Sequence, residues 1–333
     1  MHILGTRRSA LYAVAVAVLL TAMALPAGSA ASSAASGTQL KVALVAPSAT
    51  NDLAFTQSMY SALKSLQAKY GFKLSVSENE FVVANAADII RTYASEGYNL
   101  IIAHGSQYGG TIQQLAPQFP KVSFAWGTAS STFGLKNVYA YSAASNQGGY
   151  VEGYLAGLIS KSKVVGEIGP IATGDAQLYI DGFKAGVLAA APSATVHVSY
   201  TGSFSDPSVM SKQATEYLAE KADVLTGSSQ SVVGAISVAK ANNIAWFGTQ
   251  WTQASLAPKQ VVASQVYNWM PVLTSILNGI KAGKLGGQSY SITLKNGGES
   301  IQYNPGYPLS SAIKAAAAKK VAAIEANSIV LPT

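Results

Sequence analysis

The chain of 333 residues contains no cysteine. This absence excludes disulfide bonds, thiolate metal sites and cysteine nucleophiles. It also excludes an N-terminal lipid-modified cysteine, so we expect a protein without a lipid anchor. Without disulfides the fold depends on its hydrophobic core, and a chain of about 300 residues can bury a large one. That length usually corresponds to two domains.

Charged residues are scarce as well. The sequence has 22 Lys and Arg against 15 Asp and Glu, together 11% of its residues. The basic residues are scattered and form no run with interleaved aromatic residues, so no nucleic-acid-binding groove is indicated. No later segment is apolar over the roughly 20 residues that a membrane span requires.

The scarcity of histidine bears on catalysis. Metal-dependent hydrolysis requires several His, Asp or Glu ligands at close spacing, and only His104 and His197 remain beyond the N-terminal segment. Serine catalysis requires a histidine base and a carboxylate, and Gly105–Gly109 lacks the spacing of a nucleophile elbow. A secreted hydrolase with paired carboxylates stays open as an alternative, offered by Asp52, Asp175 and Asp206. We predict a protein that is not an enzyme and has no metal site or cofactor.

The N-terminal segment has the organisation of a secretory signal. Arg7 and Arg8 precede the apolar stretch Leu11–Leu25, and small residues follow as far as Ala31. A positive region, a short apolar region and small residues are typical of a signal peptide. The apolar stretch is shorter than a membrane span, which argues against a retained anchor. We predict a signal peptide over 1–31, a flexible leader over 32–39, and export to the periplasm or cell surface.

Strand-like and helix-like segments alternate along the rest of the chain. The predicted strands are Lys41–Ala46, Phe72–Glu78, Asn99–Ala103, Val122–Trp126, Val164–Ile168, Thr195–Tyr200, Val224–Thr226 and Ile244–Phe247. The predicted helices are Phe55–Tyr70, Asn85–Glu96, Thr111–Gln118, Gln147–Lys161, Ala176–Ala190, Pro207–Glu220 and Ser231–Ala241. Strands separated by helices of this length specify parallel sheets with helices on both faces.

The alternation occurs twice, with a division near Tyr141–Ser145. We therefore predict an α/β protein with two doubly wound parallel-sheet lobes, a hinge and a cleft between the lobes. The first lobe is expected to comprise residues 40–144 and about 266–285. The second is expected to comprise residues 145–262 and about 286–333.

The ends of the predicted strands indicate where a ligand binds. In open parallel sheets, ligands bind beyond the carboxyl ends of the strands. The segments at these ends are Pro47–Phe55, His104–Gly109, Trp126–Thr128, Gly169–Asp175, Gly202–Pro207, Gly227–Gln230 and Gly248–Trp251. Small polar residues and aromatic rings favour a neutral ligand that contains a ring.

Four segments in order carry a family resemblance: Asn51–Ser58, Glu152–Gly157, Gly182–Val187 and Tyr200–Pro207. Through them the chain resembles the basic membrane protein family of ABC-transporter solute-binding proteins, over nearly its whole length after the signal. The resemblance implies a type I periplasmic-binding-protein fold. It also implies a purine-like ligand between two aromatic rings, with Phe55 and Phe204 in those positions. Stacking on a base contributes roughly 1–3 kcal/mol.

Three positions depart from the nucleoside-binding members of this family. Gly127 and Gln250 stand where the resemblance leads us to expect acidic residues, and Tyr267 stands where it leads us to expect a lysine. Ribose hydroxyls without carboxylate acceptors would be poorly paired, which lowers affinity. Ser264–Trp269 looks closer to the branch associated with free purine bases. We therefore favour a purine base or another small planar heterocycle.

The predicted ligand-binding residues are Asp52, Phe55, Thr56, His104, Trp126, Phe204, Gln250, Trp251, Tyr267 and Trp269. Several have a structural alternative. Asp52 can cap a helix, Phe55 and Trp126 can belong to the core, and Tyr267 and Trp269 can line the hinge. A lone histidine such as His104 is also commonly a hydrogen-bonded structural residue.

Together these features predict a solute-binding protein that captures its ligand by lobe closure and docks on the membrane permease of an ABC importer. A monomer is expected. Alternatives are a nucleoside, a sugar or another neutral solute as ligand, or a sensory receptor that reports ligand to a membrane partner.

Overall fold

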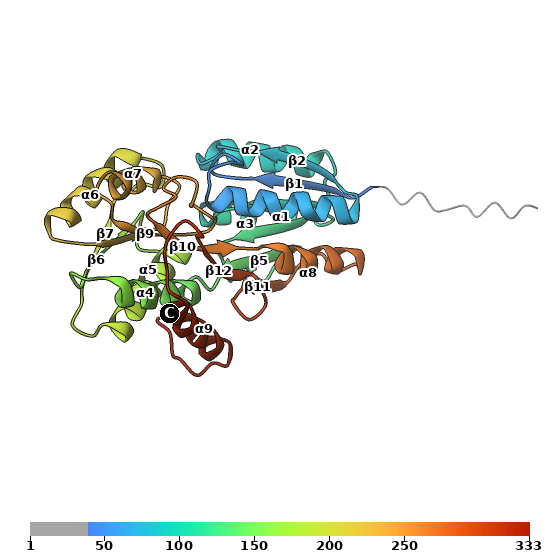
Figure 1. Ribbon diagram of the computed structural model, residues 1–333. Coiled ribbons are helices and arrows are strands. Elements are labelled where there is room, and N and C mark those ends of the chain that lie inside the picture. Colours follow the sequence, from blue (N-terminus) through green and yellow to red (C-terminus); the bar gives the residue numbers. More distant parts are fainter. Residues whose placement is uncertain (1–38) are drawn as a thin grey trace, which may run out of the picture. The chain divides into compact units, whose positions relative to one another are not determined.

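The computed structural model describes residues 39–333, which form one compact unit. The predicted signal peptide and nearly all of the predicted leader lie outside the described residues. In the described range, strands and helices alternate and build two six-stranded sheets (Figure 1). No helix between residues 39 and 333 is long and apolar enough to cross a membrane.

The first sheet has the strand order β11-β5-β4-β3-β1-β2, and all of its strands are parallel. Its strands are β1 Lys41–Val45, β2 Lys73–Ser77, β3 Leu100–Ala103, β4 Ser123–Gly127, β5 Val138–Ala143 and β11 Gln288–Ile292. The accompanying helices are α1 Phe55–Tyr70, α2 Val83–Ser95, α3 Gly109–Leu115 and α8 Met270–Lys281, with short 3₁₀ turns at Ser106–Tyr108 and Ala116–Gln118. We call these elements lobe 1.

The second sheet has the order β12-β10-β9-β8-β6-β7, parallel except for the antiparallel pair β10 and β12. Its strands are β6 Val164–Gly169, β7 Thr195–Tyr200, β8 Val224–Gly227, β9 Ala245–Gly248, β10 Val261–Tyr267 and β12 Glu299–Tyr303. Its helices are α4 Asn146–Ile159, α5 Gly174–Ala190, α6 Pro207–Ala219, α7 Val233–Ala241 and α9 Ser311–Glu325. We call these elements lobe 2. The predicted fold class is confirmed.

Both faces of each sheet are buried, as expected for parallel strands. In β1, Val42 and Leu44 belong to one hydrophobic cluster, whereas Ala43 and Val45 belong to another. Alternate residues of a strand point to opposite faces, so each central strand contributes to two cores. This requirement explains the short, continuous apolar runs of the sequence.

The chain passes between the two sheets three times. The crossings lie between β5 and α4, between β10 and α8, and between β11 and β12. The strand β11 pairs with β5 of the first sheet, although it falls within residues 286–333, which the sequence analysis assigned to the second lobe. The difference arises because β11 completes the edge of the first sheet before the chain returns to β12.

Helices α4 and α5 pack unusually closely. A side chain at Gly153 would overlap the carbonyl oxygen of Phe183, and one at Gly186 would overlap the carbonyl oxygen of Tyr150. Glycine permits this close approach because it has no Cβ. Two of the four segments that carry the family resemblance therefore owe their glycines to helix packing within lobe 2.

Candidate ligand-binding site

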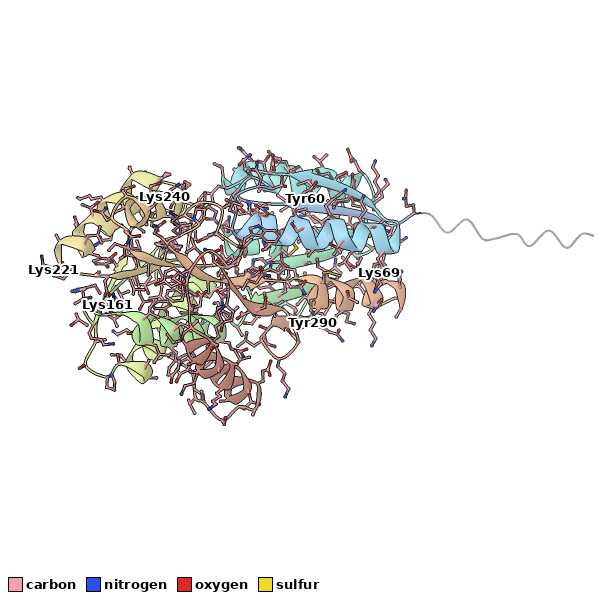
Figure 2. The ribbon with its side chains drawn as sticks, in the orientation of Figure 1. Tyr60, Lys69, Lys161, Lys221, Lys240 and Tyr290 are labelled. Carbon is pink, nitrogen blue, oxygen red and sulfur yellow. The ribbon has the colours of Figure 1, made fainter. Side chains whose placement is uncertain are left out.

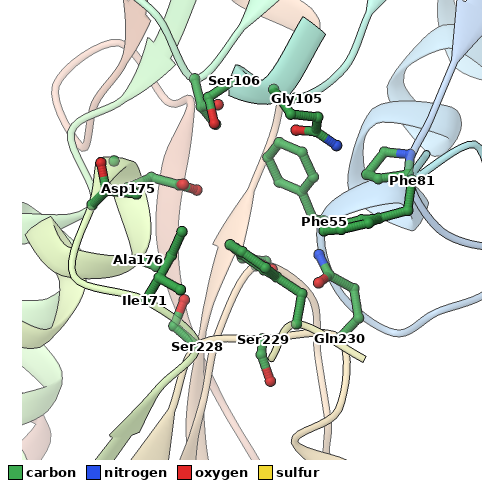
Figure 3. Close-up of a pocket in the computed structure, with 17 residues that line it drawn as sticks. Phe55, Phe81, Gly105, Ser106, Ile171, Asp175, Ala176, Ser228, Ser229 and Gln230 are labelled. Atoms are coloured by element: carbon green, nitrogen blue, oxygen red, sulfur yellow. The ribbon is translucent and has the colours of Figure 1, made fainter. Parts of the chain in front are cut away.

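A cavity of about 210 Å³ lies at the carboxyl ends of the parallel strands, with lobe 1 and lobe 2 both contributing to its walls. Its lining residues are Pro47, Phe55, Phe81, Gly105, Ser106, Gln107, Thr128, Ile171, Thr173, Gly174, Asp175, Ala176, Phe204, Ser228, Ser229, Gln230 and Gln250. In Figure 3, Phe55, Phe81 and Ser106 face Asp175, Ile171 and Ser228 across the cavity. The volume is below the roughly 300–1,000 Å³ of pockets for drug-sized ligands, so it suits a compact molecule.

Each of the seven strand-end segments predicted from sequence contributes at least one residue to this lining. The cause is topological, because the loops that follow parallel strands emerge at one edge of the sheet. Two lining residues lie outside those segments. Phe81 is on the connection from β2 to α2, and Ala176 is in the first turn of α5.

Phe55 is the most firmly held aromatic residue of the cavity. It begins α1, and its side chain is 6% exposed. Its ring stacks on His104 at 3.7 Å between centroids and 7° between planes, and meets the edge of Trp269 at 6.3 Å. These contacts cover one face of the ring, so the phenyl group is fixed before any ligand arrives.

His104 lies behind Phe55 and does not line the cavity. Its Nδ1 is 2.8 Å from the Tyr141 hydroxyl, and its Nε2 is 3.2 Å from the carbonyl oxygen of Phe55. A carbonyl can only accept, so Nε2 carries the proton and Nδ1 accepts from Tyr141. Burial lowers the pKa of His104 to about 3. The imidazole is therefore neutral and supports Phe55.

Phe204 belongs to lobe 2 and has a looser environment. It lies in the turn between β7 and α6 and is half-buried. Its described aromatic neighbour is Phe81 of lobe 1, at 5.9 Å between centroids and 48° between planes. The Phe81 side chain is 49% exposed. The two lobes thus meet at this edge of the cavity through a pair of incompletely packed rings.

Asp52 and Thr56 organise the loop that precedes α1. One Asp52 carboxylate oxygen accepts from the backbone N–H groups of Ala54 and Gln57, and the other accepts from the N–H of Thr56 and the Ser48 hydroxyl, over 2.7–3.1 Å. Thr56 is buried, and its hydroxyl is 2.6 Å from that of Ser48. Neither residue lines the cavity. Asp52 satisfies free N–H groups at a helix start, the role that a capping residue performs.

The three predicted tryptophans also lie outside the lining. Trp126 stacks on Phe133 at 4.8 Å and donates to the carbonyl oxygen of Ser106 at 3.2 Å, which holds a lining segment in place. Trp269 is fully buried and donates to the Ser58 hydroxyl at 2.9 Å. Trp251 is half-buried and follows the lining residue Gln250.

Lobe 2 supplies the carboxyl group of the cavity. Asp175 lies in the first turn of α5, and its Oδ2 accepts a long hydrogen bond from the Tyr267 hydroxyl at 3.5 Å. Burial raises the pKa of Asp175 to about 6. Tyr267 itself is buried and does not line the cavity, and its side chain reaches the site through Asp175.

Gln250 reaches the cavity on a strained backbone. Its φ is 67°, in the left-handed region that non-glycine residues rarely adopt. The side chain is 4% exposed, and its Oε1 has no hydrogen-bond partner. A buried acceptor without a partner is costly, so this oxygen is available for a donor on a ligand.

The lining is almost uncharged. Within residues 39–333, Asp175 is the one lining side chain that carries an acidic or basic group. The labelled lysines Lys69, Lys161, Lys221 and Lys240 are exposed at the periphery (Figure 2). The described residues also contain no cluster of three His, Cys, Asp or Glu that could hold a metal ion. The cavity can therefore stack on a planar ring and form hydrogen bonds to it.

Sequence reasoning did not select Asp175 or Phe81 as ligand contacts. Asp175 lay within a predicted strand-end segment, and a carboxylate in such a segment was the available signal. The sequence contains no signal for Phe81, because its place in the lining depends on how the loop after the edge strand β2 extends over the cavity.

Curated relatives were found over most of the chain. A purine-binding protein of Brucella abortus is 28% identical over 235 residues, which cover 70% of this chain and 66% of that protein. The transcriptional activator protein Med of Bacillus subtilis is 25% identical, with 77% of this chain and 80% of that protein covered. A nucleoside-binding ABC transporter protein of Lactococcus lactis is 28% identical, with 89% and 90% covered.

Among solved structures, a solute-binding protein of an ABC transporter system from Conexibacter woesei superposes with a TM-score of 0.74 at 24% identity. The match covers 88% of this chain and 98% of that one, which supports the fold. The family profile described as "ABC transporter substrate-binding protein PnrA-like" matches residues 39–332. This match confirms the predicted family and a solute-binding rather than an enzymatic role. The chain belongs to the PnrA-like family of ABC transporter substrate-binding proteins.

Proposed function

We propose that this protein captures a free purine base, or a planar heterocycle of similar size, and delivers it to the permease of an ABC importer. The observation that carries the proposal is the placement of Phe55 on lobe 1 and Phe204 on lobe 2, both lining one small, nearly neutral cavity. Base–aromatic stacking contributes roughly 1–3 kcal/mol per base. Two such rings on opposite lobes would also couple binding to closure.

The size and polarity of the cavity favour a base over a nucleoside. Its volume is about 210 Å³, and within the described chain Asp175 is its one carboxylate. A nucleoside would bring ribose hydroxyls as well as the base, and hydroxyls left without partners lower affinity. The purine-binding relative from Brucella abortus supports this choice.

A nucleoside is the second candidate ligand. Gln107, Gln230 and Ser228 line the cavity and can form hydrogen bonds to sugar hydroxyls. The nucleoside-binding relative from Lactococcus lactis favours this candidate. The two candidates are distinguished by comparing the affinity for a base with the affinity for its nucleoside.

Capture follows from the geometry of the two walls. A ligand stacked on the fixed ring of Phe55 gains contacts with Phe204 only when lobe 2 approaches. A ligand shifts the equilibrium between open and closed forms by its differential affinity for them. We propose that the closed form docks on the permease outside the cytoplasm, after export directed by residues 1–31. A sensory role is the alternative that the relationship to a transcriptional activator keeps open.

Thermal unfolding tests the ligand class directly. The purified protein would be heated with purine bases, nucleosides, pyrimidines and sugars, each at a range of concentrations. A ligand at 100 times its Kd adds about 2.7 kcal/mol to the free energy of unfolding, which corresponds to roughly 5–10 °C for a chain of this size. We expect a shift with purine bases and a smaller one with their nucleosides. No shift with any purine, together with a shift from another solute, would refute the purine assignment.

A further inference from the structure

We propose that Asp175 and Gln250 form the recognition end of the cavity and bind two adjacent N–H donors on one edge of the ligand. This inference rests on the proposed function and narrows it to a ligand class. The class is planar heterocycles with a lactam N–H next to a second N–H, as on the Watson–Crick edge of guanine. Asp175 then becomes the specificity-determining residue of the site.

Gln250 supplies the first acceptor. Its side chain lines the cavity, and its Oε1 is buried without any hydrogen-bond partner. The backbone at Gln250 is fixed by its own carbonyl, which accepts the N–H of Tyr267 at 3.1 Å. A buried acceptor on a constrained residue costs stability in the empty protein. An N–H donor from a bound ligand would remove that cost.

Asp175 supplies the second acceptor. An ionised carboxylate accepts hydrogen bonds and donates none. The Tyr267 hydroxyl contacts only Oδ2, and at 3.5 Å. The backbone N–H of Asp175, the hydroxyl of Tyr267, the N–H of Ala176 and the amide of Gln250 all lower the pKa of the carboxyl and so favour its charged form, although burial outweighs them. The carboxylate therefore retains capacity for a ligand donor, and Asp175 lines the same cavity as Gln250, whose Oε1 has no partner.

The position of Asp175 is fixed from the hinge. The Ser145 hydroxyl donates to the Asp175 carbonyl oxygen at 2.6 Å. Ser145 lies on the crossing from β5 to α4, and Tyr267 ends β10 just before the crossing to α8. The side-chain amide of Gln265 donates to the Ser145 carbonyl at 3.0 Å and joins these two crossings. Ser145 and Tyr267 are thus positioning residues that hold the carboxyl group toward the cavity.

The other polar groups of the lining do not offer the same pattern. The Ser229 hydroxyl is hydrogen-bonded to that of Ser231 at 2.8 Å and also accepts the N–H of Ser231 at 3.2 Å. The remaining polar side chains, such as Ser106, Thr128 and Gln230, can both donate and accept, so they do not discriminate between edges. Two acceptors that face one edge of a ligand would discriminate strongly, because a ligand acceptor placed there would leave its own lone pair, Asp175 and the Gln250 oxygen all without a donor.

The test is a thermodynamic cycle that combines a change in the ligand, methylation at N1, with a change in the protein, substitution of Asp175. Calorimetry would give the Kd of guanine, 1-methylguanine and adenine for the wild-type protein, for Asp175→Ala and for Asp175→Asn. Methylation at N1 removes one N–H and leaves the stacking surface. Asp181→Asn, on the same helix but outside the lining, is the matched control.

We expect the wild-type protein and the Asp181→Asn control to bind guanine roughly 10- to 100-fold more tightly than 1-methylguanine, the ratio typical of a hydrogen bond to a charged group. The proposal places the N1–H of guanine on Asp175 and the exocyclic N–H on Gln250. In Asp175→Ala the ratio should therefore fall to about 1–3, because the acceptor for N1–H is gone. Tyr267→Phe should lower guanine affinity and leave 1-methylguanine affinity unchanged, an effect that a general loss of packing would not produce.

An equal methylation penalty in the wild-type protein and in Asp175→Ala would overturn the inference, as would tighter binding of adenine than of guanine by the wild-type protein. Both outcomes leave the purine proposal intact. If the folded wild-type protein binds none of the three bases, the proposed function itself fails. Binding of an organic cation instead would mean that Asp175 recognises charge, which also overturns the inference.

Discussion

The two lobes share an architecture, but lobe 1 buries a histidine whereas lobe 2 buries three glutamates. In lobe 1, His104 is buried behind the cavity wall, and this burial lowers its pKa to about 3. In lobe 2, burial raises the pKa of Glu152, Glu167 and Glu299 well above their usual range. All four side chains are therefore held in their neutral forms. A fall in pH destabilises the folded state through His104, which must bind a proton to become charged, and favours it through the three glutamates, which bind their protons more readily when folded. Both lobes thus have the same fold, but the buried side chains of each lobe determine how its stability responds to pH.

The walls also differ in readiness for a ligand. The Phe55 ring packs against His104 and Trp269, and its carbonyl oxygen accepts a hydrogen bond from His104 Nε2. On lobe 2, Phe204 is half-buried, the Gln250 Oε1 lacks a partner, and Asp175 is a half-buried carboxyl. We infer that the side chains of lobe 1 are fixed before the ligand binds, whereas those of lobe 2 complete their interactions only with the ligand.

Phe55→Ala should have the largest effect on lobe 1. We expect a loss of about 3–5 kcal/mol in the free energy of unfolding, the range for buried Phe→Ala changes, together with loss of detectable purine binding. The reason is that His104 and Trp269 lose the ring on which they pack. Urea unfolding and calorimetry would measure both effects. Unchanged stability would mean that the packing of lobe 1 does not depend on Phe55.

Phe204→Ala should separate binding from stability. We expect roughly 1–3 kcal/mol less binding free energy, from the lost stacking, and a change below about 1 kcal/mol in unfolding, because the ring is incompletely packed. Calorimetric affinities and urea midpoints would be compared with Val233→Ala, an exposed apolar control on lobe 2. Affinity within twofold of the wild type would contradict the two-ring arrangement.

His104→Gln tests the acid response of lobe 1. Its pKa is 6.5 when unfolded and about 3 when folded, so between these values the unfolded chain binds the extra proton. Stability from this group is present above pH 6.5 and is lost as pH falls. At pH 5 the loss is about 2 kcal/mol. His104 should therefore lower the urea midpoint of the wild-type protein at pH 5 relative to pH 7.5. We expect His104→Gln to remove this contribution from the difference between the two midpoints. A wild-type pH dependence retained in full by the variant would show that the imidazole titrates normally.

Asp175→Asn tests the opposite response in lobe 2. The pKa of Asp175 rises from 3.8 to about 6 on folding, so the folded protein binds the extra proton between these values. The carboxylate therefore destabilises the empty protein above pH 6, by about 1–2 kcal/mol for a half-buried group. We expect the variant to unfold at higher urea than the wild type at pH 7.5 and at equal urea near pH 4. A destabilised variant at pH 7.5 would indicate a structural role for the charge.

Much of the fold was predictable from local patterns. The central strands are short apolar runs because both sheet faces are covered, and β1 and β3 follow this pattern directly. The placement of β11 was not predictable, because Gln288–Ile292 is half-exposed and joins the first sheet only through pairing with β5. Its register depends on a strand about 150 residues earlier, a distance that local periodicity cannot encode.

The candidate site was predictable at the level of loops and less so at the level of side chains. Chain topology brings the strand ends together, so all seven segments reach the cavity. Which residue of a loop faces inward depends on partners far away in sequence. His104 turns away to Tyr141, Asp52 turns back to its own loop, and Asp175 is met by Tyr267. Distant partners of this kind leave no signature in a single sequence.

The contact between α4 and α5 distinguishes the residues that identify the family from those that line the cavity. Gly153 and Gly186 are dictated by two helix backbones that nearly touch, and neither residue lines the cavity. Under the proposed function, a chain could exchange Asp175, Gln250 and Phe204 for other side chains, and so change its ligand, without disturbing this helix contact. The residues that identify the family therefore differ from the proposed ligand contacts, so membership of the family does not by itself specify the solute.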